Sequence, residues 1–152
     1  MLWKDEIFIE LQKQNLFQDS AHRTRFKELL DCYYKASFFT VGLCKCMYLS
    51  CWDDEHFIIM LDMLNQLSLK ENMNLDDMHE TGQLLAEEAD GHYSNYVMQL
   101  SCAFLMDQPF DTNILPADLA PEGRYIIETA LKASAAIDSI PYYTGGVKIS
   151  RF

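Results

Sequence analysis

The stretch LCKCMYLSCWDDEHF, residues 43–57, holds three cysteines, three acids and a histidine. These are the side chains that bind zinc, but zinc needs several ligands that converge at about 2 Å. In a helix Cys44 and Cys51 project to similar sides and Cys46 nearly opposite, while in a strand Cys44 and Cys46 share a face that Cys51 does not. Neither structure gathers the three thiols, and the C-x-x-C motif of redox proteins is absent. We interpret the cysteines as buried, and the acids as capping and dipole residues where one helix ends and the next begins.

Two further groups could hold a metal ion on a helix. Glu88 and His92 lie four residues apart, and Asp76, His79 and Glu80 are close in sequence. Such groups arise easily by chance in an acidic helix, so we predict no metal site, no cofactor and no catalytic residue. A small metal-dependent enzyme that uses histidine and carboxylate side chains stays open as the alternative function.

The net charge of −11 is concentrated in the middle of the chain. Residues 1–52 carry +1, residues 53–94 carry −10 and residues 95–152 carry −2. Direct nucleic-acid binding needs clusters of Lys and Arg on the protein, so this distribution argues against it. It favours a basic protein surface as the partner.

Apolar residues recur at helical spacing along most of the chain, which predicts an all-α fold with five to seven helices. We expect one helical domain over residues 1–140 and a short extended tail over 141–152. The core is expected around the apolar segments 37–51, where a strand is a weaker alternative, and 54–66. Residues 67–74 are expected to form a loop. Other helices are expected over residues 2–14, about 20–35, 74–90, from 93 to about 105, and 121–138, with one short helical turn in the proline-rich loop before the last helix.

Start signals support several of these helices. Asp19 or Ser20 can cap the second helix, and Asp53 or Asp54 the one that follows the cysteines. The helix over 74–90 is expected to carry an acidic face opposite an apolar one. We predict that the acidic face binds the partner through Asp76, Glu80, Glu87 and Asp90.

The stretch LFQDSAHRTRFKELLDCYY resembles a group of small uncharacterised proteins of Gram-positive bacteria and their mobile elements. The matching positions follow a pattern of an aromatic residue, a His-Arg pair, an aromatic residue, Leu-Leu and Tyr, here Phe17, His22, Arg23, Phe26, Leu29, Leu30 and Tyr34. The segments CMYLSC, MQLSCAFL and YIIETALKASAAI add to the resemblance, which spans residues 16–138. It implies a mostly helical fold and brings no activity and no catalytic residue.

His22 and Arg23 fall in the first turn of a helix, where cations are not electrostatically favoured. They are candidates for a partner contact, and the alternative is that they pair with acids elsewhere in the fold, for example from residues 53–90.

The first residues do not form a secretory signal, and the apolar run 36–52 is short for a membrane span and is interrupted by Lys45. Five irregularly spaced cysteines are typical of reduced thiols in a cytoplasmic protein. We therefore expect a non-enzymatic interaction module, an accessory or inhibitor protein of a mobile element, that binds no membrane. The tail is expected to pack loosely or to add a strand to another chain, which leaves a homo-oligomer open.

Overall fold

The computed structural model describes residues 2–69, 94–144 and 147–148. These residues form six α-helices, one 3-10 turn and a hairpin of two very short strands. The all-α prediction is therefore confirmed. The elements are α1 (Trp3–Lys13), α2 (Ser20–Tyr33), α3 (Val41–Ser50), α4 (Asp54–Leu69), α6 (Ser94–Leu105), η1 (Thr112–Ile114), α7 (Pro121–Asp138), β1 (Tyr143–Thr144) and β2 (Val147–Lys148).

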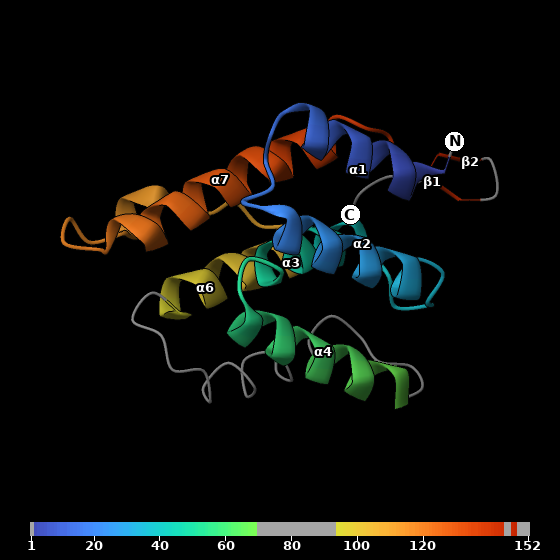
Figure 1. The fold of residues 1–152 in the computed structure, drawn as a ribbon, viewed down its shortest axis with the longest axis horizontal. Helices are drawn as coiled ribbons and strands as arrows, with labels where there is room; N and C mark the ends of the chain where they lie inside the picture. The colour runs from blue at the N-terminus through green and yellow to red at the C-terminus, as the bar shows by residue number, and fades with distance from the viewer. Residues whose placement is uncertain (1, 70–93, 145–146, 149–152) are drawn as a thin grey trace.

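Helix α3 is the centre of the molecule, and α2, α4, α6 and α7 all pack against it. α1 and α7 run side by side along one edge of the fold, while α4 lies along the opposite edge (Figure 1). The strands β1 and β2 pair antiparallel, with Tyr143 opposite Lys148 and Thr144 opposite Val147. No helix in the described ranges has the length and apolar character needed to cross a membrane.

All ten residues of α3 are buried, including Lys45. The Lys45 ammonium group forms an ion pair of 2.8 Å with Asp138 at the end of α7, and it lies 5.8 Å from the ring centre of Phe104 in α6. A buried charge is tolerated only when it is paired, because desolvation is costly. The helix expected over residues 37–51 is thus present and starts later, at Val41, because the Thr40 hydroxyl caps it by accepting from the Leu43 amide at 3.0 Å.

Gly42 sets how closely α3 approaches α6. A Cβ atom at this position would lie 2.3 Å from the carbonyl oxygen of Phe104 and 3.4 Å from the Cα atom of Leu105. Backbone atoms cannot rotate away as a flexible side chain can. Glycine is therefore required here for close packing, not for an unusual backbone angle.

Two other helix starts match the predicted signals. The Asp19 carboxylate accepts from the His22 amide at 2.8 Å and caps α2, and the Asp53 carboxylate accepts from the His56 amide at 2.9 Å at the start of α4. α7 begins at Pro121, where the missing N–H is no loss, and ends at Asp138 as predicted. The short turn expected in the proline-rich loop is η1.

Two helices end in the same backbone motif, which the sequence analysis did not identify. After α1, Asn15 adopts the left-handed conformation (φ 57°), its amide donates to Gln12 O, and the Leu16 amide donates to Leu11 O at 3.0 Å. After α6, Asp107 (φ 51°) takes the same place, and the Gln108 amide donates to Ala103 O at 2.8 Å. These are Schellman motifs, which satisfy the last carbonyl groups of a helix. Both are built on residues other than glycine.

α4 is longer than predicted. It continues through Leu69, although residues 67–74 were expected to form a loop. Leu67 is buried and extends the inner face formed by Met60, Met63 and Leu64, so packing against the core holds this additional turn in the helix.

The first residues of the predicted tail pack against the core instead of lying loosely. The Trp3 indole N–H donates to Ile140 O at 3.2 Å, and the Trp3 ring meets the Tyr142 ring edge-on at 4.9 Å. Tyr142 is half-buried and also lies 6.3 Å from the ring of Phe39. These contacts tie the first helix to the residues that follow the last one.

We expect the substitution Gly42→Ala to lower the free energy of unfolding by about 1–2 kcal/mol. Overpacking costs ~1–3 kcal/mol, which exceeds the gain of ~0.5–1 kcal/mol from replacing glycine in a helix. Urea denaturation of both proteins measures the change. The control is T24A at an exposed position of α2, expected within about 0.5 kcal/mol of the wild type. Unchanged stability in G42A would contradict the close packing of α3 on α6.

Ending the chain after Ser139 should lower the free energy of unfolding by about 1–3 kcal/mol, because it removes the carbonyl acceptor of Trp3 and the Tyr142 ring. A chain that ends after Tyr142 keeps both contacts and serves as the matched control. Thermal and urea denaturation would compare the two truncations with the full chain. Equal stability of both truncations would show that Ile140 and Tyr142 do not belong to the core.

Candidate functional site

The stretch 43–57 forms the junction between α3 and α4, as predicted. α3 ends at Ser50, and Asp53 begins α4 with its carboxylate on the His56 amide. The same Asp53 oxygen lies 2.7 Å from Nδ1 of the buried His56 ring, while Asp54 and Glu55 stand in the first turn. The acids and the histidine of this stretch therefore cap and orient a helix.

The three thiols of the stretch are buried and protonated at neutral pH. Burial raises the pKa of the Cys44, Cys46 and Cys51 thiols well above the usual value. The Cys46 thiol donates to Ser101 O of α6 at 3.2 Å. Since the thiolate is the nucleophile and the metal ligand, these cysteines have the properties of core residues. All five cysteines are free.

His22 is fully buried, so its ring does not lie at the surface where a partner contact was expected. Its Nδ1 atom accepts from the Gln18 amide at 3.0 Å, and Nε2 lies 2.8 Å from Tyr48 O. Since Nδ1 is an acceptor, the proton belongs on Nε2, which donates to the carbonyl group. The aromatic rings of Phe17, Tyr48 and Trp52 surround the imidazole at centroid distances of 5.4, 4.7 and 5.0 Å.

Burial lowers the pKa of His22 from 6.5 to about 4, against the opposing effects of the Tyr48 carbonyl and Asp19. The ring is therefore neutral near pH 7. This explains how a histidine fits in the first turn of α2, where a positive charge would oppose the helix dipole. The alternative that His22 pairs with acids is wrong, because both ring nitrogen atoms bond to backbone groups. One group belongs to the α1–α2 linker and the other to α3, so the ring connects the two.

Arg23 is partly exposed and forms no ion pair with any residue that the structure describes. Arg25, two residues later, makes the contacts between elements in this region. Its guanidinium group forms an ion pair with Asp54, donates to Cys51 O at 3.2 Å, and lies 5.9 Å from the ring centre of Phe57. It thus joins α2 to the α3–α4 junction. No pattern in the sequence distinguishes Arg25 from Arg23.

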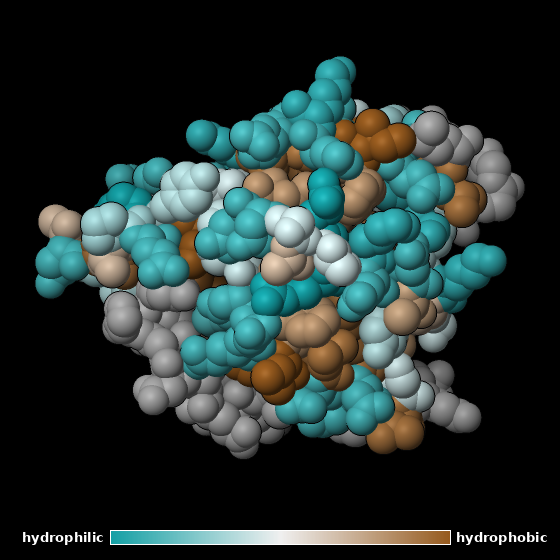
Figure 2. Space-filling view, in the orientation of Figure 1, coloured by the Kyte–Doolittle hydropathy of each residue, from teal (hydrophilic) through white to brown (hydrophobic). Residues whose placement is uncertain are grey.

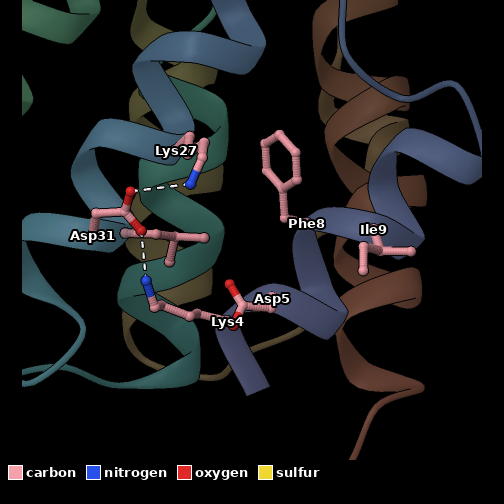
Figure 3. Close-up of a pocket in the computed structure, with 7 residues that line it drawn as sticks. Lys4, Asp5, Phe8, Ile9, Lys27 and Asp31 are labelled. Carbon is pink, nitrogen blue, oxygen red and sulfur yellow. Dashed lines mark hydrogen bonds and ion pairs between the residues drawn. The ribbon is translucent and has the colours of Figure 1, made fainter. Parts of the chain in front are cut away.

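A pocket of about 120 Å³ lies between α1 and α2. Its lining includes Lys4, Asp5, Phe8, Ile9, Lys27 and Asp31 (Figure 3). The Asp31 carboxylate accepts from Lys4 Nζ at 2.6 Å and from Lys27 Nζ at 3.1 Å, and Lys27 Nζ lies 5.9 Å from the centre of the Phe8 ring (Figure 3).

The charges of this pocket compensate one another. The hydrogen bond from Lys4 lowers the pKa of Asp31, and the same bond raises the pKa of Lys4. Both shifts move the pKa values further from pH 7, whereas a general acid or base works best with a pKa near the operating pH. The arrangement is suited to joining α1 and α2, with two cations sharing one carboxylate.

The acidic face predicted from the sequence, Asp76, Glu80, Glu87 and Asp90, lies outside the described residues. So do the metal candidates Glu88, His92 and His79. The acidic region begins within the described part, because α4 carries Asp54, Glu55 and Asp62 and neither Lys nor Arg. Among residues 2–69 and 94–144, no three His, Cys, Asp or Glu side chains lie close enough to hold a metal ion together.

The buried His22 should make stability depend on pH. Its pKa rises from about 4 in the folded state to 6.5 in the unfolded state, so the unfolded chain binds the proton more tightly. The stability that the folded state gains by keeping His22 neutral is fully present above pH 6.5 and is lost as the pH falls toward 4. Its full size is roughly 3 kcal/mol, since one pKa unit is worth about 1.4 kcal/mol.

Urea denaturation of the wild type and of the variant His22→Gln across this pH range tests the effect. Glutamine keeps one donor and one acceptor but does not titrate, so the decline should flatten. An equal decline in both proteins would assign the pH dependence to other groups.

Comparison with known proteins leaves the chain without an identified relative. No family model, curated protein or solved structure matches it. The resemblance to small proteins of Gram-positive bacteria stays a prediction, and the function must be inferred from the chain's own residues.

Proposed function

We propose that this chain is a non-enzymatic, cytoplasmic protein-interaction module. Its acidic segment, residues 76–90, binds a basic surface of a partner protein through Asp76, Glu80, Glu87 and Asp90. The partner class is a protein whose own binding surface is rich in Lys and Arg, such as a nucleic-acid-binding groove. An accessory or inhibitor role in a mobile element is part of the proposal and rests on the family resemblance.

The observation that carries the proposal is the concentration of charge. Residues 53–94 hold −10 of the net −11. Like charges four residues apart, as at Asp76 and Glu80, cost an isolated helix ~0.2–0.5 kcal/mol, while opposite charges at the same spacing stabilise it by a similar amount. This segment thus forgoes ion pairs within a helix, and a basic partner would supply the missing cations.

The described residues support the proposal in a second way. Two candidates from the sequence have structural partners here, since Asp53 caps a helix and His22 bonds to the backbone. The pocket acid Asp31 likewise pairs with two lysines. The acids of α4 precede the acidic segment in the sequence, and α4 runs along one edge of the described fold (Figure 1).

Charge removal should weaken partner binding without loss of folding. We expect the triple variant D76Q, E80Q and E87Q to retain its circular-dichroism spectrum and thermal stability. Its capture of basic proteins from a lysate should fall at least about threefold. Close charge pairs across an interface raise the association rate and fix how the two surfaces align. Raising the salt from about 0.05 M to about 0.3 M should weaken wild-type capture as well.

The matched control is the triple variant E28Q, D118N and E128Q. It removes the same charge from exposed positions on α2, the loop before α7, and α7. Capture should be close to wild type in this control. If the first variant keeps every specific partner with unchanged affinity, the acidic segment serves only solubility.

A further inference from the structure

The outer side of α4 carries an exposed stripe that combines apolar and acidic residues. Its members fall at helical spacing on one face: Asp54, Ile58, Leu61, Asp62, Asn65 and Leu69. We call this face the α4 stripe. It lies opposite the inner face, where His56, Met60, Met63, Leu64 and Leu67 are buried.

The apolar members of the stripe are unusually accessible. Ile58 is 58% exposed, Leu61 37% and Leu69 79%. The described part of the chain has four other exposed large apolar residues, Leu2, Ile9, Ile114 and Tyr125, and none of them lies on α4. In Figure 2, apolar side chains in brown lie among hydrophilic ones in teal along the edge where α4 runs in Figure 1. Exposed apolar residues gathered on one element mark interaction surfaces.

We infer that the α4 stripe is a docking surface for an amphipathic basic helix of a partner protein. The inference rests on the proposed function and extends it, because it adds an apolar contact to the charge attraction. Ile58 and Leu69 are eleven residues apart, which corresponds to about 16 Å or three turns. A partner helix of about four turns, with apolar residues on one face and Lys or Arg beside them, matches both the length and the charge of the stripe.

Charge decides among the occupants. A second copy of this chain would bring Asp54 and Asp62 against acids of its own kind, and each copy has a net charge of −11. An anionic membrane surface would meet the same repulsion. A basic helix instead places its cations beside exposed Asp62 and beside Asp54, whose side chain remains 84% exposed in its ion pair with Arg25.

The test uses two synthetic peptides of about 15 residues, made of Leu, Ala and Lys. One peptide is amphipathic as a helix, and the other has the same composition in an order that is not amphipathic. Titration of fluorescently labelled peptide with the full chain measures Kd. The amphipathic peptide should bind at least about fivefold more tightly than its control, and the double variant I58S and L61S should raise its Kd about five- to tenfold.

Two control variants separate the apolar contribution from charge. I9S changes an exposed apolar residue of α1 and should leave Kd unchanged. D62N keeps the apolar residues and should weaken binding and reduce its dependence on salt.

Several results would overturn the inference. Equal binding of the two peptides, with no effect of I58S and L61S, would do so and would leave the proposed function intact if the D76Q, E80Q and E87Q variant lost binding. Failure of both peptides to bind would count against both proposals. A drop in thermal stability of the I58S and L61S variant, comparable to that of a core substitution, would show that the chain itself covers the stripe. If the wild type dimerises in sedimentation experiments and this variant does not, the stripe binds a second copy of the chain. If the wild type binds phosphatidylcholine vesicles and this variant does not, the stripe binds a membrane.

Discussion

The complete burial of α3 is the constraint on which the rest of the structure depends. A helix that exposes no side needs neighbours all round, and α2, α4, α6 and α7 supply them. The contact with α6 is closed by Gly42, where even a methyl group has no space. The one charged group of α3, the Lys45 ammonium, must find its counter-charge inside the fold, and Asp138 at the end of α7 provides it. Burial of α3 thereby fixes the position of the end of α7, since Asp138 lies 93 residues after Lys45.

Polar residues in this molecule satisfy backbone groups at the ends of helices. Asp19, Thr40 and Asp53 accept from free amides at the starts of α2, α3 and α4. Arg25 donates to the carbonyl group of Cys51, just after α3. His22 does the same work between elements, since it accepts from one backbone amide and donates to one backbone carbonyl group. A short chain with this many helices has many ends, and unsatisfied backbone groups at each of them would be costly.

The sequence predicted the local features of the fold well. The bounds of α7, the caps at Asp19 and Asp53 and the turn at η1 depend on neighbouring residues, and each has a signal within a few positions. Features that depend on distant partners were missed. The last turn of α4 depends on the burial of Leu67, and the role of His22 depends on Tyr48, 26 residues away. The helix ends at Asn15 and Asp107 were missed for a different reason, because glycine is the usual residue in a left-handed helix end and none marks these two positions. Of the candidate site, the sequence alone carries the acidic segment, while the α4 stripe appears only when exposure is known.

The contact between Trp3 and residues 140–142 has a consequence for how the chain is made. The indole donor and its carbonyl acceptor are separated by 137 positions, so they can meet only after the segment between them, α7 included, has been synthesised. Until then α1 lacks both this contact and α7, the helix beside which it runs. Its buried residues Trp3, Ile7 and Leu11 leave the ribosome well before α7, so part of their packing must wait for that helix. Such a non-local closure carries a loop entropy that local helix pairs do not. α1 is thus made before α7 but can complete its packing only once α7 and residues 140–142 are present.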